Sequence, residues 1–204
     1  AEDSPCGQVA DYKVIADYDD LEGIRKLAEV SDVITYEFEN IDAAALEWLC
    51  EQAYVPQGKS LLEITQDRVK EKAAITNAGV EVAPYAVINS LNDLQENCER
   101  LGYPVVLKTA RGGYDGKGQA VLKSHQDIEE AQALLDNGQC ILEKWISFTK
   151  EISVIITRNS NGESAVFPVG ENIHHDNILH QTIAPARISK QAEDKAIQSA
   201  IQLA

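Results

Sequence analysis

Glycines and basic residues gather in one short stretch of this sequence, LKTARGGYDGKGQAVL, which covers residues 107–122. The glycines are Gly112, Gly113, Gly116 and Gly118, and the basic residues are Lys108, Arg111 and Lys117. Because glycine allows positive φ and close backbone approach, successive N–H groups here can point at one anion. The basic side chains can neutralise several negative charges at once. The pattern therefore predicts a site for a polyphosphate.

Two familiar phosphate-binding loops do not fit this stretch. The Walker motif needs a Ser or Thr and a helix after its lysine, whereas Lys117 is followed by Gly118 and a predicted strand. The dinucleotide fingerprint GxGxxG fails because Val121 stands in place of its third glycine. Since strands are predicted on both sides, we expect a hairpin flap that covers phosphates. A plain glycine-rich hairpin turn is the alternative.

A second candidate segment is CILEKWISFTKEISVII, residues 140–156. Its strand around Glu143 and Lys144 could offer backbone N–H and C=O groups to an adenine edge, next to apolar surface from Trp145 and Ile146. Glu151 follows eight residues after Glu143 and could accept hydrogen bonds from ribose hydroxyls. The alternative is an edge strand whose Glu and Lys side chains are solvated.

Arg68 and Lys72 are a third candidate group. Residues 59–79 are predicted to be helical, with Thr65 as an N-cap and Gly79 as the stop. On one helix, Arg68 and Lys72 share a face at i, i+4. They could meet phosphates, or they could pair with Glu63 and Glu71 on a solvated face.

Two further polar groups have weaker signals. His174, His175 and His180 lie close to Asp176, but no pair has the HxxxH spacing, so a strand end or loop that lines a pocket is favoured over a metal site. Glu37 and Glu39 share one face of a predicted strand. They could face a substrate at the carboxyl end of that strand, or be polar edge residues.

Strands and helices alternate along the chain. Strands are predicted at 12–17 and 32–38, with helices from 20 to 30 and after Asp42, which is the rhythm of a parallel α/β layer. Further strands are predicted at 82–88, 103–110, 118–122, 140–146, 151–159 and 164–175, with helices at 92–101 and 127–135. Asn161-Gly162 predicts a hairpin between the last two strands. The fold class is α/β (α+β).

Composition narrows the class of protein. The chain has 204 residues, a net charge of −15 and a sequence pI of about 4.6. Such an acidic surface argues against a nucleic-acid or anionic-membrane binder, although a pocket can be locally basic. The four cysteines are widely spaced, which favours neither a zinc site nor a disulfide framework and is consistent with a reducing cytosol. No apolar run reaches the length of a membrane helix.

Both ends of the sequence have the character of cut ends. There is no Met at all, and the chain begins at Ala1 without a preceding strand and glycine-rich turn. It stops at Ala204 inside an amphipathic helical pattern. We therefore expect a partial Rossmann-like domain over 1–58 and a partial second domain over 59–204.

Five motifs in order carry a resemblance: TYEFENI, TQDRVKEK, GYPVVLKTARGGYDGKGQ, ILEKWISFTKEISVI and ENIHHDNILHQTIAPA. The chain resembles the 5-(carboxyamino)imidazole ribonucleotide synthases, which are ATP-grasp ligases of purine biosynthesis, from about Glu2 to Ser189. The resemblance implies a Rossmann-like pre-ATP-grasp domain over 1–58, followed by the first part of an ATP-grasp domain over 59–204. Within the latter, it implies that 59–140 includes a small glycine-flap subdomain and that 141–204 begins a second subdomain. It also implies a cytoplasmic homodimer with ATP, Mg²⁺, bicarbonate and aminoimidazole ribonucleotide as small-molecule ligands, and places the metal ligands beyond Ala204.

The resemblance also implies roles for individual residues. ATP phosphates would meet Arg68, Lys108 and the loop from Gly113 to Gln119. Adenine would lie against Glu143 to Ile146, ribose against Glu151, and His174 would be a further nucleotide-site residue. Lys108, Tyr114 and Asp115 are the candidates for catalytic roles, with the last two facing the imidazole ribonucleotide. The nucleotide-site residues of the loop are Gly113, Tyr114, Asp115, Gly116, Lys117, Gly118 and Gln119.

The reaction implied is ATP-dependent carboxylation through carboxyphosphate. A closing flap would protect this labile intermediate from water and hold charge-stabilising donors around it. Two alternatives stay open: another ATP-grasp ligase with a different acceptor, and a nucleotide-binding module without catalysis.

Overall fold

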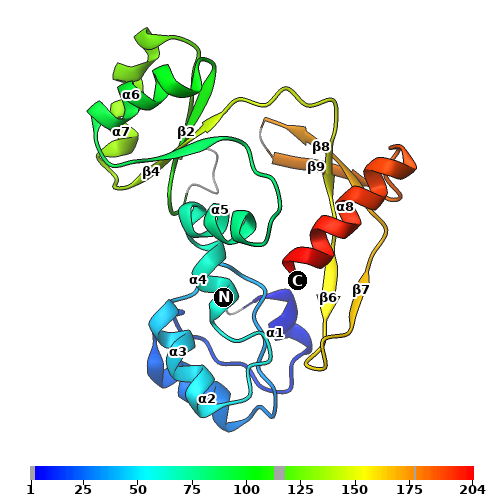
Figure 1. The fold of residues 1–204 in the computed structure, drawn as a ribbon. Helices are drawn as coiled ribbons and strands as arrows, with labels where there is room; N and C mark the ends of the chain where they lie inside the picture. Colours follow the sequence, from blue (N-terminus) through cyan, green and yellow to red (C-terminus); the bar gives the residue numbers. More distant parts are fainter. Residues whose placement is uncertain (1–2, 113–117, 177) are drawn as a thin grey trace. The chain divides into compact units, whose positions relative to one another are not determined.

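A computed structural model describes residues 3–112, 118–176 and 178–204, with the side chain of Glu130 also left out of the description. The chain divides into two compact units, residues 1–66 and 67–204. Each unit is described by itself. Figure 1 shows the elements of both.

The first unit is built from helices around a small apolar core. Its helices are α1 (Pro5–Val9), α2 (Leu21–Glu29), α3 (Ala43–Gln52) and α4 (Ser60–Thr65). Side chains of Ser4, Asp20 and Asp42 cap the first three by accepting hydrogen bonds from the first-turn amides. The core members are Ile34, Leu46, Leu49, Val55 and Leu62.

The predicted strands at 12–17 and 32–38 were wrong, because no strand is assigned among residues 3–66. Both segments are extended, yet their backbones find few ladder partners. The Ile34 amide donates to the Tyr54 carbonyl. The side chain of Gln57 pairs with the Tyr36 backbone: its Oε1 accepts from the Tyr36 N–H, and its Nε2 donates to the Tyr36 carbonyl. A side chain thus satisfies groups that a neighbouring strand would otherwise pair, and the expected parallel layer is absent from the described part of this unit.

The predicted helix over 59–79 is divided in two. Helix α4 ends at Thr65, and α5 runs over Arg68–Asn77. Thr65 was the wrong N-cap. Asp67 has that role, because its carboxylate accepts hydrogen bonds from the Val69 and Lys70 amides. Gly79, with φ of 77°, does follow the end of the helix as expected.

The second unit opens with a four-stranded antiparallel sheet. Its strands are β1 (Tyr85–Ile88), β2 (Val105–Thr109), β3 (Gln119–Leu122) and β4 (Cys140–Lys144), in the order β1-β4-β2-β3. Helices α6 (Leu91–Leu101) and α7 (Ile128–Leu135), the latter preceded by the 3₁₀ turn η1 (His125–Asp127), cover one face (Figure 1). These strands and helices confirm the sequence predictions for 82–146.

Alternation along the strands gives the sheet two different faces. Val105 and Leu107 of β2, with Cys140 and Leu142 of β4, lie fully buried in the core beneath α6 and α7. The side chains at the alternate positions of these two strands, which include Lys108 and Glu143, point to the opposite face of the sheet. The sheet therefore separates a packed apolar side from a side that carries charge.

The rest of the second unit contains five short strands and a long helix. β5 (Glu151–Ser153), β8 (Gly170–His175) and β9 (Ile178–Ile183) form one antiparallel sheet, and β6 (Ile156–Arg158) pairs with β7 (Ser164–Val166). The hairpin predicted at Asn161-Gly162 is confirmed, but each of the two long predicted strands is split between the two sheets. Helix α8 (Lys190–Leu203) follows. The whole is an α+β arrangement of helices and antiparallel sheets.

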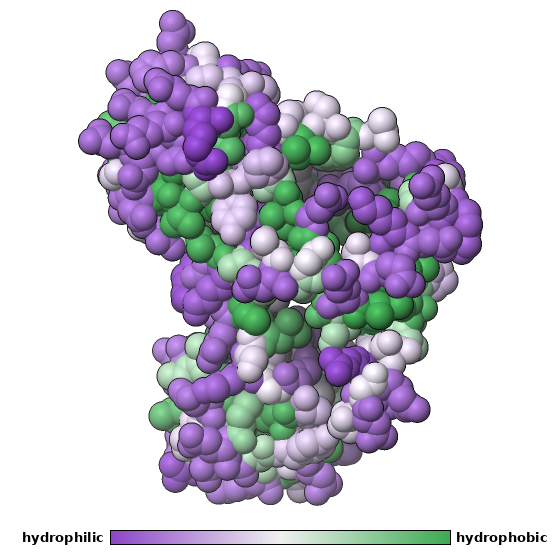
Figure 2. All heavy atoms as spheres, in the orientation of Figure 1, coloured by the Kyte–Doolittle hydropathy of each residue, from purple (hydrophilic) through white to green (hydrophobic). Residues whose placement is uncertain are grey.

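Among the described residues, no helix is both long and apolar enough to cross a membrane. Large apolar side chains nevertheless remain exposed in the second unit, including Phe148, Ile155 and Phe167. Apolar atoms are visible on the surface in Figure 2. Exposure of an apolar side chain is therefore not by itself a sign of a ligand site in this chain.

Candidate nucleotide-binding site

The charged face of the four-stranded sheet brings two of the predicted site residues together. Lys108 stands opposite Ile141 in the β2–β4 register, and Glu143 stands opposite Val106, so both side chains leave the same face one diagonal apart. The Lys108 Nζ donates to the Glu143 Oε2 over 2.6 Å. Gln119 of β3 lies directly opposite Lys108 on that face. Cross-strand register therefore assembles three residues that the sequence separates.

A second lysine reaches the same carboxylate from helix α5. Lys72 Nζ lies 2.9 Å from Glu143 Oε1, so each carboxylate oxygen of Glu143 faces one ammonium group. The side chains are only 18%, 28% and 11% exposed for Lys72, Lys108 and Glu143. Burial works to raise the pKa of Glu143, but the hydrogen bonds and charges of Lys108 and Lys72 outweigh it and hold the pKa below its usual value. Glu143 is therefore a carboxylate at neutral pH, and two lysines against one carboxylate give the cluster one formal excess positive charge.

Arg68 binds the backbone at the start of the glycine loop, between Thr109 and Gly112. Its Nη1 donates to the carbonyls of Thr109 and Gly112 over 2.9 and 2.8 Å, and its backbone N–H donates to the Ala110 carbonyl. These partners are main-chain carbonyls, which differs from the alternative that Arg68 pairs with acidic side chains on a solvated face. Its predicted contact with phosphates stays a prediction.

Both edges of the glycine loop are tied to the sheet. Gly112 adopts a positive φ of 70°, and the Gly118 carbonyl accepts a hydrogen bond from the Thr109 amide. The predicted nucleotide-site residues Gly113, Tyr114, Asp115, Gly116 and Lys117 lie outside the described residues. The hairpin placement of the loop between β2 and β3 is confirmed.

In the segment from Glu143 to Ile146, some polar groups face the charged cluster and others hydrogen-bond within the fold. The Lys144 side chain points away from Glu143, and its Nζ donates to the Gly102 carbonyl over 2.6 Å. The amides of Lys144 and Trp145 donate to the Pro84 and Pro104 carbonyls, so they are already used. Within this described segment, the amide of Ile146 remains as a main-chain donor that an adenine base could use. Trp145 and Ile146 are 44% and 49% exposed.

Glu151 and His174 form a second group. β5 and β8 pair with Glu151 opposite Asn172, and His174 Nε2 lies 3.5 Å from Glu151 Oε1. A register shift between Ile173 and His174 marks a bulge in β8, a feature that re-aims a side chain. The structure thus joins two residues that the sequence analysis assigned to one nucleotide. In the described part of the chain, Glu151 and His174 pair with each other and make no ion pair with Lys72, Lys108 or Glu143.

The other histidines do not form a metal centre in the described part of the chain. His175 Nδ1 lies 3.0 Å from Asp176 Oδ2, and the rings of His175 and His180 are 6.4 Å apart. No group of three or more His, Cys, Asp or Glu side chains among the described residues is arranged to hold a metal ion. Asp176 has φ of 51° at the turn between β8 and β9.

Sequence reasoning missed two features of the charged residues. It considered Lys72, but only with phosphates or helical neighbours, because no local pattern points from α5 to β4. It did not single out Glu171, which is 6% exposed and accepts hydrogen bonds from Lys150 and Arg187. These donors hold the pKa of Glu171 at about 2. A lone Glu in a strand gives no sequence signal for such burial.

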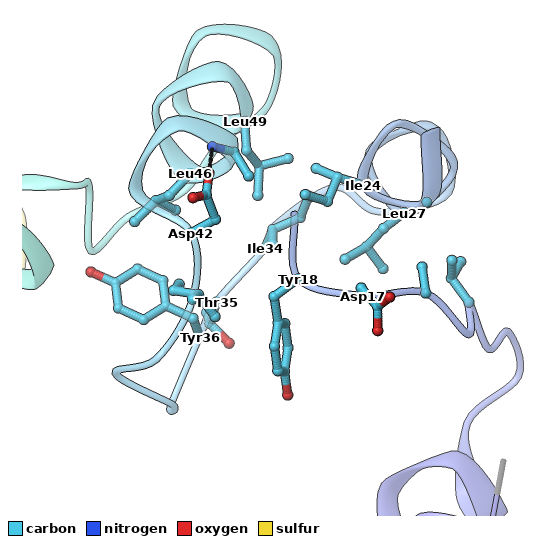
Figure 3. A pocket seen from close by; sticks show the side chains of 15 residues that line it. Asp17, Tyr18, Ile24, Leu27, Ile34, Thr35, Tyr36, Asp42, Leu46 and Leu49 are labelled. Atoms are coloured by element: carbon cyan, nitrogen blue, oxygen red, sulfur yellow. Dashed lines mark hydrogen bonds between the residues drawn. The ribbon is translucent and has the colours of Figure 1, made fainter. Parts of the chain in front are cut away.

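A pocket of about 220 Å³ in the first unit contains none of the predicted site residues. Ile24, Leu27, Ile34, Leu46 and Leu49 line it, with Tyr18 and Tyr36 beside them (Figure 3). Its apolar lining offers little chemistry. Glu37 and Glu39 line a separate pocket with Gln57 and Leu62, and their contact with a substrate stays a prediction.

Comparison with known proteins matches both units. The sequence model of the ATP-grasp domain matches residues 73–204, and that of the ribonucleotide synthetase preATP-grasp domain matches residues 1–66. The chain is 58% identical over 202 residues to N5-carboxyaminoimidazole ribonucleotide synthase of Bacillus subtilis (strain 168), which covers 99% of this chain and 53% of that protein. The chain therefore spans about half the length of the curated relatives it matches.

Solved structures agree with this assignment. An ADP complex of an N5-carboxyaminoimidazole ribonucleotide synthetase aligns with a TM-score of 0.96 and 54% identity, over 100% of this chain and 54% of that one. The Aspergillus clavatus synthase, in complex with ADP and 5-aminoimidazole ribonucleotide, aligns with a TM-score of 0.89 and 27% identity, over the same shares of the two chains. The domain match covers well over half of this sequence, and its closely similar relatives are ATP-grasp ligases: the chain belongs to the ATP-grasp family.

Proposed function

We propose that this chain carries the ATP-binding part of an N5-carboxyaminoimidazole ribonucleotide synthase. The observation that carries the proposal is the cluster of Lys72, Lys108 and Glu143 at the base of a glycine-rich hairpin. It supplies excess positive charge next to a loop whose composition suits phosphates. The identity to the Bacillus subtilis synthase supports the same reaction.

ATP would span the two groups of site residues. Its phosphates would meet Arg68, Lys108 and the loop up to Gln119, and adenine would lie against Glu143 to Ile146. Glu151 would accept hydrogen bonds from the ribose hydroxyls, with His174 beside it. The ADP bound in one similar structure supports nucleotide binding by this fold.

The chemistry proceeds in two transfers. An oxygen of bicarbonate attacks the γ-phosphorus of ATP while the bond to the ADP oxygen breaks, which gives carboxyphosphate and ADP. The exocyclic amine of aminoimidazole ribonucleotide then attacks the carboxyl carbon, phosphate leaves, and the amine loses a proton. Lys108 would neutralise charge on the transferred phosphoryl group, while Tyr114 and Asp115 would face the imidazole ribonucleotide. Positioning and charge neutralisation are the main contributions that phosphoryl transfer requires from a protein.

Several expectations stay predictions. Mg²⁺ would neutralise the phosphate oxygens when bound. A homodimer, a cytoplasmic location and the division into subdomains at 59–140 and 141–204 also rest on the family resemblance alone.

The test is ADP release by the full-length protein. We expect release that depends on bicarbonate and rises when aminoimidazole ribonucleotide is added, with one N5-carboxylated product for each ADP. Omission of bicarbonate is the control. Stimulation by a different amine or acid, and not by this nucleotide, would overturn the substrate assignment while leaving the ATP site intact.

A further inference from the structure

Lys72 is the one member of the charged cluster that sequence motifs do not assign to the nucleotide. It lies on α5, one helical turn after Arg68, and its ammonium group contacts Glu143 on β4. Arg68 fixes the same helix to the carbonyls of Thr109 and Gly112. Lys72 is therefore held in place by the element that also holds the loop entrance.

Lys72 raises the net charge of the cluster by one positive charge. If Lys108 and Glu143 were alone, the pair would be neutral, and the carboxylate would compete with a phosphate for the Lys108 ammonium group. Lys72 occupies one carboxylate oxygen, so the cluster has one uncompensated positive charge in a place with little exposure to water. Attraction between charges is strengthened where water is excluded.

The position of Lys72 on its helix is electrostatically unfavourable without an anion nearby. Arg68, Lys70 and Lys72 all fall within the first five residues of α5. Cations are disfavoured near a helix N-terminus, because the backbone dipole already places positive charge there. Asp67 at the N-cap, Glu71 in the first turn and Glu143 on β4 offset this charge, so Lys72 depends on Glu143 as its own counter-charge.

We propose that Lys72 is a positioning residue that sets the charge of the ATP phosphate site, by sharing Glu143 with Lys108 so that Lys108 stays available to the nucleotide. The inference rests on the proposed ATP site and deepens it. It predicts that the contribution of Lys72 grows with the number of phosphates on the ligand. Lysine suits this role, since an ammonium group has three donors and Glu143 uses only one from each partner.

The experiment compares Lys72→Met with Lys70→Met in the full-length protein, by calorimetric titration with ATP, ADP and adenosine. Lys70 is an exposed lysine on the same helix, so the control removes the same charge without touching Glu143. Loss of one charged contact weakens binding by roughly 10- to 100-fold, and we expect that loss for ATP with Lys72→Met. Adenosine binding should stay unchanged, and Lys70→Met should leave all three ligands unchanged.

Two further variants separate charge from packing. Lys72→Arg keeps the charge and should bind ATP nearly as well as the wild type. The double variant Lys72→Met/Glu143→Gln restores one excess positive charge and should recover most of the affinity lost in Lys72→Met. Equal weakening for adenosine and ATP, or no recovery in the double variant, would overturn the charge-setting role.

The proposed function and this inference fail in different ways. A wild-type protein that does not bind ATP would refute the nucleotide site itself. If wild type and Lys72→Met bind ATP equally, while Lys108→Met does not bind it, the site stands and the role of Lys72 is refuted. A cooperative thermal transition for each variant checks that it is folded.

Discussion

Two buried carboxylates of the second unit, Glu143 and Glu171, each accept hydrogen bonds from two basic side chains, yet they are satisfied to different degrees. Glu171 receives four donors: Lys150 Nζ, and the Nε, Nη2 and backbone N–H of Arg187. Glu143 receives one donor from each of two lysines. A fully satisfied carboxylate stabilises a fold, whereas a partly satisfied one leaves donors of its lysine partners for a ligand.

The geometry of the partners explains the difference. The planar guanidinium of Arg187 matches both oxygens of Glu171 in a fork. Lys72 and Lys108 are point charges with rotatable donors, and each retains some exposure. The comparison therefore indicates a structural role for Glu171 and supports the proposed role of Glu143 at a ligand site, and substitutions can test both roles.

The largest effect is expected for Lys108→Ala. A ligand present at about 100 times its Kd stabilises a protein by about 2.7 kcal/mol, and the wild type should show such protection from heat with ATP. The variant should lose nearly all of it, because Glu143 and Lys72 would then form a neutral pair. Thermal melts with and without ATP measure this, with Lys70→Ala as the matched control. An unchanged shift would remove Lys108 from the site.

A large loss of stability without a comparable loss of ATP affinity is expected for Glu171→Gln. The amide would leave Lys150 and Arg187 next to each other without a counter-charge. We expect Tm to fall by more than for any surface substitution described below, measured in thermal melts at pH 7. If Tm were unchanged and ATP affinity collapsed, the distinction between the two carboxylates would be reversed.

The pH dependence of stability gives a sharper test of the same residue. Arg187 and Lys150 lower the pKa of Glu171 from 4.5 to about 2. Because the folded pKa is the lower one, this contribution to stability is complete above about pH 4.5 and disappears as pH falls toward 2. The difference in Tm between wild type and Glu171→Gln should therefore shrink across that interval. A constant difference from pH 6 to pH 3 would contradict the assignment.

A smaller effect is expected for Asp67→Ala. This substitution removes the N-cap of α5, the helix that carries Arg68 and Lys72, and loss of a cap costs about 1 kcal/mol. Urea unfolding of the full-length protein measures it. Asp67→Asn keeps a capping oxygen and should recover most of the loss, whereas equal losses in both variants would point to the charge of Asp67.

The smallest effect is expected for Arg111→Ala. Its Nε lies 3.1 Å from Asp67 Oδ2, but the Arg111 side chain is 64% exposed, and exposed ion pairs contribute about 0–1 kcal/mol. Unfolding in urea should differ from wild type by no more than that range. A larger loss would mean that the partner of Asp67 matters more than its capping hydrogen bonds.

Sequence reasoning succeeded where local signals and alternation agree. The four strands of the first sheet were predicted, because each is a short apolar run, and Gly102 and Gly138 mark the ends of the two helices between them. It also placed the glycine loop in a hairpin. Those features depend on neighbours along the chain, which a sequence displays directly.

It failed where partners are far apart in sequence. Lys72 and Glu143 form an ion pair between a helix and a strand of the sheet. A strand was expected at 32–38, because nothing in the sequence shows that the Gln57 side chain hydrogen-bonds to the Tyr36 backbone. The break between α4 and α5 was also missed, since the Arg68 amide at the start of α5 donates to the carbonyl of Ala110, a partner far along the chain. Such partners are set by tertiary contacts rather than by local propensity.

The opposite orientations of Glu143 and Lys144 have a consequence for mutational scanning. Glu143 meets the two lysines of the site, whereas Lys144 binds the Gly102 carbonyl on the far side of the sheet. ATP binding and protein abundance, measured for variants at each position, should therefore respond differently along β4. Substitutions at 143 would weaken ATP binding while the protein still accumulates, whereas substitutions at 144 would reduce protein abundance.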